Sequence, residues 1–351
     1  MSALTIILRA VHTNEYAITP GNATNVAPLV SVHGLATDAH RDRIMLVDVY
    51  LQPLSELQYL VMHLQSHVQF VSADQLLEPG IPNSQLSAQG FLQMADSQLA
   101  AKVAALRALG WRVPATPTGA VVTGVVENTP ASRAGINVGD EITAINGHPV
   151  TSACSLVGVL SSVPANSRLR VALIPGKFSP TGVYTHSAPV TLTLTSARSP
   201  SAGALTGCVR YPHAGPSWLG IAPEDGAHFV LPGTITVNTA NIGGPSAGLA
   251  MTLTLIDALS RGSLTGGHAI AATGTIDPLG QVGDVGGVAE KTIAVENAGA
   301  QYFFVPTAEV ATARAVASPS LHVVGVDTLG QVLRDLQAIG GAVPVALSRP
   351  H

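Results

Sequence analysis

Charged residues are scarce in this chain of 351 residues, at 11% against 46% hydrophobic residues. The formal net charge is −4, and no run of basic residues occurs. Nucleic-acid surfaces need clustered lysine and arginine, so nucleic acid is excluded as a partner. The chain is long enough for two or three domains, each with its own buried core.

Cysteine is even rarer, because only Cys154 and Cys208 occur and they lie far apart. Zinc sites and disulfide-stapled scaffolds show characteristic paired spacings, which this sequence lacks. We therefore predict neither a zinc site nor a disulfide framework, and the cysteines leave the cellular compartment open.

Long apolar runs are also missing. The N-terminal run Leu4 to Leu8 is too short for a signal peptide, and a spanning helix needs about 18 or more apolar residues. The longest run, Leu249 to Leu259, contains Thr252, Thr254 and Asp257. We expect it to be a buried core helix.

The first 117 residues are predicted to form a mixed region of strands and helices. Extended segments are expected at 16–19, 29–32 and 44–51, with a turn at Pro20-Gly21, and a helical period begins at Pro53. A second helix is expected from Ser87 to Leu109, with Gly110 as its cap.

His63 and His67 are four residues apart on the helix predicted after Pro53, a spacing that can hold a metal. No glutamate lies between them as in a metalloprotease helix, and no third ligand stands nearby. Two ligands make a weak signal, so we predict no metal site.

The pattern Thr-Pro-Ala-Ser-Arg-Ala-Gly begins at Thr129, and Gly-Asp-Glu-Ile followed by Ile-Asn-Gly ends at Gly147. By this pattern, residues 118–197 resemble a PDZ domain. Later strands are expected at 171–174 and 190–195, and a linker at 196–207. The resemblance implies binding of polypeptide C-termini by strand addition, with a Gly-Leu-Gly-Phe-like loop holding the carboxylate. The nearest candidate loop, Leu109-Gly110-Trp111, is better interpreted as the helix cap.

The sequence Gly244-Pro245-Ser246-Ala247-Gly248 stands before the run Leu249 to Leu259. Proline favours a first helical turn, and a serine there would face free backbone N–H groups and the positive end of the helix dipole. This position suits a nucleophile next to an oxyanion site.

An alternative reading of this stretch is the G-x-S-x-G elbow of α/β-hydrolases. Asp277 or Asp284 and then His322 follow Ser246 in the order of that fold. The elbow, however, needs a strand that ends at the serine, and the last expected strand residue is Val237. We therefore hold the esterase interpretation as a less favoured alternative.

Lysine is rare in this chain, which has only Lys102, Lys177 and Lys291 against 14 arginines. Lys291 lies on a helix predicted from Val288 to Ala298, at the centre of its apolar face, while Glu290 is expected to point elsewhere. Burial lowers the pKa of an amine, and a neutral amine is a usable general base for a serine hydroxyl.

Residues of about 200 to 345 resemble the proteolytic domain of the Lon family. The run Thr-Gly-x-Ile from Thr273 to Gly-Gly-x-x-x-Lys at Lys291 follows Gly-Pro-Ser-Ala-Gly by the family's spacing. The resemblance implies Ser246 as nucleophile and Lys291 as base. It also implies supporting or oxyanion roles for Gly244, Pro245, Ala247 and Thr273. Gly243 and Thr275 depart from the family pattern, which has acidic residues there.

The whole chain thus resembles the ATP-independent, PDZ-containing Lon-like proteases of bacteria. We expect an α/β (α+β) fold with an N-terminal region at 1–117, a PDZ domain at 118–197 and a proteolytic domain at 198–351. No G-x-x-x-x-G-K-[ST] motif occurs, and no cofactor is expected.

The resemblance implies an endopeptidase acting on flexible or unfolded proteins. It also implies a homo-oligomer such as a hexameric ring, and an extracytoplasmic place at a membrane, although the chain shows no anchor. The alternative from another class is a catalytically silent PDZ module that binds peptides or assembles.

Overall fold

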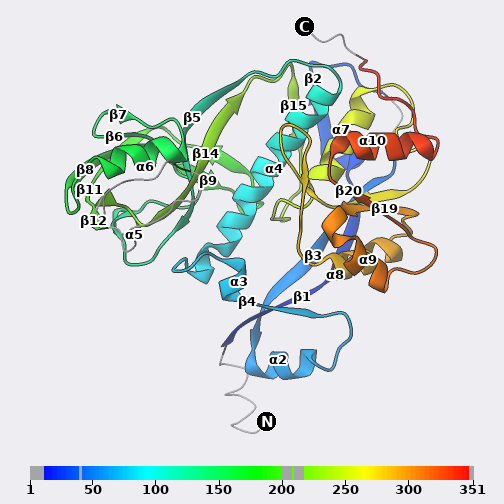
Figure 1. The fold of residues 1–351 in the computed structure, drawn as a ribbon, viewed down its shortest axis with the longest axis horizontal. Helices are drawn as coiled ribbons and strands as arrows, with labels where there is room; N and C mark the ends of the chain where they lie inside the picture. The colour runs from blue at the N-terminus through cyan, green and yellow to red at the C-terminus, as the bar shows by residue number, and fades with distance from the viewer. Residues whose placement is uncertain (1–11, 39–41, 199–207, 209–216, 348–351) are drawn as a thin grey trace. The chain divides into compact units, whose positions relative to one another are not determined.

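The structure is a computed structural model that describes residues 12–38, 42–198, 208 and 217–347 (Figure 1). These residues form two compact units. The first contains Met1–Leu76, Asp96–Val113 and Leu231–His351, and the second contains Leu77–Ala95 and Pro114–Val230. The second unit is therefore inserted into the first along the chain.

The first unit is built on a sheet that combines strands from both ends of the chain. Its order is β20 (His322–Val326), β19 (Tyr302–Pro306), β16 (Ile270–Ala272), β3 (Ile44–Ser55), β1 (His12–Asn25) and β4 (Gln69–Ser72). From β20 to β3 the neighbours are parallel, and β3, β1 and β4 are antiparallel. Two short pairs accompany it: β2 (Val30–His33) with β15 (Thr234–Val237), and β17 (Thr275–Ile276) with β18 (Val282–Gly283).

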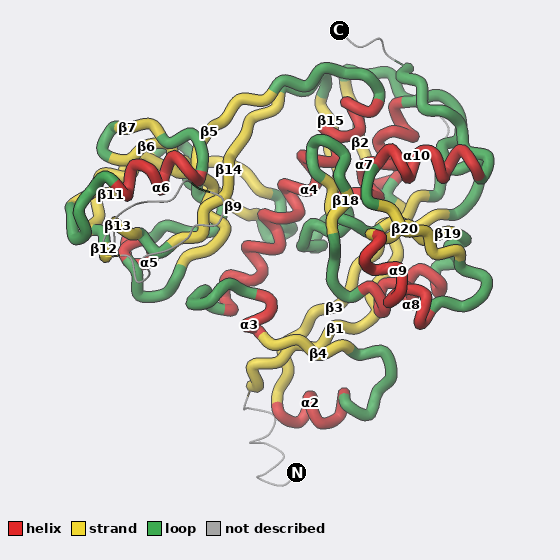
Figure 2. Tube along the Cα trace, in the orientation of Figure 1, coloured by secondary structure: helices red, strands yellow, loops and turns green. Residues whose placement is uncertain are grey.

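The helices of this unit are α2 (Glu56–Met62), α3 (Ala73–Leu76), α7 (Gly248–Leu259), α8 (Val288–Asn297), α9 (Val310–Val316) and α10 (Leu329–Ala338) (Figure 2). Short 3-10 turns are η1 (Ala27–Leu29) and η3 (Thr307–Glu309). Every residue of α7 is buried, and the hydroxyls of Thr252 and Thr254 donate to carbonyls one turn earlier. The run expected to be a core helix is therefore confirmed as one.

The second unit is a β-rich fold with two short helices. Its sheet has the order β11 (Val190–Thr195), β8 (Arg168–Ile174), β6 (Glu141–Ile145), β5 (Ala115–Val125) and β14 (Ile221–Phe229), with β7 (His148–Pro149) beside β6. The smaller pairs are β9 (Gly176–Phe178) with β10 (Tyr184–His186), and β12 (Ala197–Arg198) with β13 (Ser217–Trp218). The helices are α5 (Pro130–Ala134) and α6 (Ala153–Ser161). One apolar core fills the space between them.

The helix α4 (Leu86–Ala108), preceded by η2 (Asn83–Gln85), has residues in both units. It ends where the sequence predicts, since Gly110 has φ +84° and the Trp111 N–H donates to the Leu106 carbonyl. This is a glycine C-cap. Leu109-Gly110-Trp111 therefore closes a helix.

The expected domain boundaries differ from these units. The N-terminal strands β1 and β3 do not form a region of their own, because β3 pairs in parallel with β16. Likewise β14, expected in the proteolytic domain, pairs with β5 of the second unit. Both differences arise from pairing between segments far apart in sequence, which local patterns do not encode. The α+β class itself is confirmed.

Two local expectations in the N-terminal region were wrong. The turn expected at Pro20-Gly21 lies inside β1, where a register irregularity between Pro20 and Ala23 absorbs it. The helix expected after Pro53 is short, because α2 ends at Met62. Its apolar side chains are not buried: Val61 is exposed by 49%, and Leu64 beyond its end by 88%. His63 stacks on Phe70, and no group of three metal-ligating side chains occurs within the described residues.

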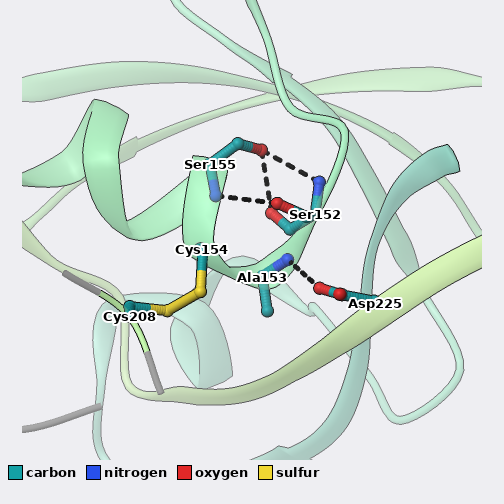
Figure 3. The surroundings of a disulfide bond; sticks show 6 residues. All are labelled: Ser152, Ala153, Cys154, Ser155, Cys208 and Asp225. Carbon is teal, nitrogen blue, oxygen red and sulfur yellow. Dashed lines mark hydrogen bonds between the residues drawn. A yellow bond between two sulfur atoms is a disulfide. The ribbon is translucent and has the colours of Figure 1, made fainter. Parts of the chain in front are cut away.

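A disulfide joins Cys154 in α6 to Cys208, with 5.3 Å between the two Cα atoms (Figure 3). The prediction that these cysteines carry no disulfide was therefore wrong. The sequence separation of 54 hid the pair, because spacing alone does not show which distant segments fold together. Of the linker expected at 196–207, Ser196 is buried and Ala197–Arg198 form β12, while 199–207 lie outside the described residues. Within the described chain no helix combines the length and apolarity of a membrane span.

Two buried carboxylates meet at the C-terminal end of α7. The Asp42 N–H donates to Asp257 Oδ2 (3.0 Å) and the Leu264 N–H to Asp257 Oδ1 (3.3 Å). Asp42 in turn accepts from the Ser263 hydroxyl and from the Thr265 N–H. Burial raises the pKa of Asp257 from 3.8 to about 6, and the Asp42 carboxylate adds to this rise.

We predict that this pair makes stability depend on pH. The folded state retains a proton that the unfolded chain releases between about pH 4 and 6, so the free energy of unfolding falls as pH rises through this window. Asp257→Asn should flatten the slope in urea denaturation at several pH values, whereas exposed Asp327→Asn should retain it. If the free energy of unfolding of Asp257→Asn fell with pH as steeply as that of the wild type, the retained proton would not be on Asp257.

Candidate active site

Ser246 lies in a turn that leads into α7, two residues before Gly248. The Gly248 N–H donates to the Pro245 carbonyl (3.3 Å), and Gly244 has φ +88°, a conformation that favours glycine. The expectation that Pro245 and Ser246 form the first helical turn was therefore wrong by about one turn. Ser246 is half-buried, ahead of the helix N-terminus.

Lys291 is in the first half of α8, and only 2% of it is exposed. Gly287 precedes the helix with φ +68°, and a Cβ there would lie 3.1 Å from side chains of Ile18 and Val49. Glycine thus lets α8 approach β1 and β3 closely, which shields the lysine. Burial lowers the pKa of Lys291 from 10.5 to about 8, although the negative charges of Glu309 and Asp48 act against this.

Thr273 connects the lysine to the serine. Lys291 Nζ donates to Thr273 Oγ1 (3.2 Å), and Thr273 Oγ1 donates to the Ser246 carbonyl oxygen (3.3 Å). The Gly274 N–H donates to the same oxygen (2.9 Å). The structure therefore brings together three residues that the sequence singled out. No hydrogen bond joins Nζ to Ser246 Oγ within the described residues.

The backbone around Ser246 offers free donors. The N–H groups of Ser246 and Ala247 make no hydrogen bond within the described part of the chain, whereas Gly248 and Leu249 donate to carbonyls. Pro245 has no N–H, so its contribution is to backbone shape. Two adjacent unpaired N–H groups beside a serine hydroxyl are the arrangement that stabilises an oxyanion.

Residues of the hydrolase alternative are engaged elsewhere. His322 is on β20 and stacks on Tyr302, with 5.1 Å between ring centroids. Asp277 Oδ1 accepts from the N–H groups of Leu279 and Gln281, which holds a turn. Within the described residues, no hydrogen bond joins Ser246 to His322, Asp277 or Asp284. In addition, β15 ends at Val237, nine residues before the serine.

Glu290 does not follow the sequence expectation. It was expected to point away from the buried face, but it is only 4% exposed, and its Oε2 has no hydrogen-bond partner among the described residues. The reason is that α8 packs against β1, β3 and α9, so more than one of its faces is covered. Burial raises the pKa of Glu290.

A second candidate site lies in the inserted unit, and the sequence did not predict it. The edge strand β14 begins after Leu219-Gly220, whose N–H groups make no hydrogen bond within the described residues, and Gly220 has φ +83°. Helix α6 lies beside β14, and the Ala153 N–H at its start donates to Asp225 of β14 (2.8 Å; Figure 3). A free strand edge beside a helix, with unpaired N–H groups at the strand's start, suits an extended peptide ending in a carboxylate.

The signal for this loop was present in the sequence. Trp218-Leu219-Gly220-Ile221 is a Gly-Leu-Gly-Phe-like tetrapeptide, but it follows the rest of the PDZ pattern instead of preceding it. The candidate loop near Leu109 therefore lies at the wrong end of the domain. The strand that follows Gly220, β14, lies beyond the expected end of the PDZ domain at 197 and completes the sheet.

Comparisons with known proteins match two separate parts of the chain. A model of the PDZ domain matches residues 105–177, and a model of the C-terminal proteolytic domain of Lon protease matches residues 235–338. Over 56 residues, 16% of this chain, the sequence is 39% identical to the periplasmic serine endoprotease DegP of Escherichia coli, of which this covers 12%.

Over 134 residues, 36% of this chain, it is 32% identical to Lon protease 1 of Herpetosiphon aurantiacus, of which this covers 16%. The chain thus spans less than a fifth of the length of these curated relatives. One region of the chain thus matches the PDZ domain, and another matches the C-terminal proteolytic domain of Lon protease.

Proposed function

We propose that this protein is a serine endopeptidase that uses Ser246 as nucleophile and Lys291 as general base. The observation that carries this proposal is the chain of hydrogen bonds from buried Lys291 through Thr273 to the Ser246 backbone. A lysine whose pKa is lowered to about 8 is partly neutral near physiological pH, so it can accept a proton.

In the first step neutral Lys291 accepts the Ser246 hydroxyl proton while Oγ attacks the scissile carbonyl carbon. The N–H groups of Ser246 and Ala247 stabilise the tetrahedral oxyanion. The Lys291 ammonium then protonates the leaving amine, and an acyl-enzyme remains. Water, deprotonated by the same lysine, releases the acyl group and restores the serine. Thr273 orients Nζ throughout.

Substrate selection follows from what the sequence contains. No nucleotide-binding motif is present, so we propose that cleavage needs no ATP and acts on flexible or unfolded segments. The edge of β14 beside α6 would hold the C-terminal end of such a segment by strand addition.

Substitution of the dyad tests the proposal. Ser246→Ala and Lys291→Ala should each lower the cleavage of an unfolded protein such as reduced casein by about a thousandfold or more, with or without ATP. The matched control Lys177→Ala removes an exposed lysine of the inserted unit and should retain full activity. Full activity in Lys291→Ala, with loss in Lys102→Ala, would assign the base to the other buried lysine. An inert wild type would favour the binding module.

The pH profile of the same assay reports the state of the base. Because the protonated lysine cannot accept a proton, kcat/KM should rise with pH and level off above about 8. A rate that is constant down to pH 5 would rule out a lysine base.

The buried lysine should also lower stability. A fall in pKa from 10.5 to about 8 corresponds to about 3 kcal/mol that favours the neutral form, so the folded state is penalised when Lys291 is charged. Lys291→Met retains the shape of the side chain without this cost. We predict a higher melting temperature at pH 7 together with loss of activity. A lower melting temperature would mean that the amine stabilises the fold.

Peptide capture can be measured on inactive Ser246→Ala protein. Peptides with a free, apolar C-terminus should bind at least about tenfold more tightly than their C-terminal amides, because the amide lacks the charge that the Leu219 and Gly220 N–H groups recognise. N-terminal acetylation, the matched control, should leave binding unchanged. Equal affinity of acid and amide would exclude carboxylate recognition.

A further inference from the structure

The second half of α4 contacts the loop that precedes Ser246. Ser97 Oγ donates to the Pro245 carbonyl oxygen (2.9 Å), and Gln98 Nε2 donates to Thr239 Oγ1 (3.0 Å). Ser97 is only 5% exposed. Two consecutive α4 side chains therefore hold both ends of the segment from Thr239 to Pro245.

The Ser97 contact fixes one particular peptide group. The Pro245 carbonyl and the Ser246 N–H belong to the same planar peptide, and in a trans peptide they point in opposite directions. Holding the carbonyl oxygen therefore sets the direction of the Ser246 N–H. The other bond to this oxygen, from the Gly248 N–H, is longer at 3.3 Å.

The space for the Ser97 hydroxyl is kept open by glycine. A Cβ at Gly248 would lie 2.9 Å from Ser97 Oγ and 2.8 Å from Ile276 Cγ2. Any side chain at position 248 would therefore displace either the hydroxyl or β17. The close approach of α4 to the start of α7 thus depends on glycine at position 248.

The peptide on the other side of Ser246 is held as well. Its carbonyl oxygen accepts from the Gly274 N–H and from Thr273 Oγ1. Ser246 is consequently fixed by hydrogen bonds on the carbonyls of both flanking peptides. The bond from Ser97 orients the Ser246 N–H, and the bonds to the Ser246 carbonyl orient the Ala247 N–H in the same way.

We propose that Ser97 is a positioning residue that aims the Ser246 N–H at the oxyanion of the tetrahedral intermediate. This proposal rests on the proposed function of Ser246 as nucleophile. The oxyanion forms only during the reaction, so the loss of Ser97 should affect the transition state more than substrate binding.

The test compares Ser97→Ala with Ser87→Ala, an exposed serine of the same helix whose hydroxyl makes no hydrogen bond within the described residues. Ser97→Ala should lower kcat about tenfold or more with little change in KM, and the pH midpoint should stay that of the wild type. The affinity for a peptide boronate, which forms a tetrahedral adduct with a serine, should fall by a similar factor. Ser97→Cys, a weaker donor of similar size, should lie between alanine and serine.

Several results would overturn the proposal. They are a kcat and boronate affinity equal to those of Ser87→Ala, a rise in KM alone, or a loss explained by a smaller folded fraction in thermal melts. The proposed function is tested separately, because Ser246→Ala must abolish both cleavage and boronate binding. If Ser246→Ala does so while Ser97→Ala behaves like its control, only the positioning role fails.

Discussion

The burial of a single amine, that of Lys291, constrains the packing around the candidate active site. Lys291 Nζ has Thr273 Oγ1 as its hydrogen-bond partner within the described residues, and the nearby negative charges of Glu309 and Asp48 offset its burial only in part. Keeping the amine dry needs close packing of α8 on β1 and β3, which Gly287 permits. The strands from the N-terminal end of the chain are therefore part of the surroundings of the candidate site.

Thr273 and the two peptides around Ser246 connect this packing to the positions of the lysine and the serine. Thr273 follows β16 directly, so its position depends on the central sheet. Its hydroxyl holds the lysine on one side and the serine backbone on the other. In this way Lys291 and the Ser246 backbone share one hydrogen-bonding partner. The Ser97 hydroxyl adds a hydrogen bond to the peptide that precedes Ser246.

The sequence was sufficient where the signal is local or is carried by a motif. The helices α4, α7 and α8 follow from periodicity and glycine caps, and Ser246, Thr273 and Lys291 follow from motif spacing. It was insufficient where distant segments pair: β3 with β16, β14 with β5, and Cys154 with Cys208. Glu290 was expected to be exposed but is buried, because more than one face of α8 is covered. The apolar side chains of α2, by contrast, proved to be exposed. These outcomes depend on tertiary packing, which no short window contains.

The division of the first unit along the chain has a consequence for its synthesis. β1 and β3 leave the ribosome early, but their partner β16 and the lysine in α8 follow only after the inserted unit. The inserted unit consists of nearly contiguous sequence, so it can fold while the strands of the first unit wait. The candidate site, which needs Lys291, can therefore form only when the chain through α8 has emerged.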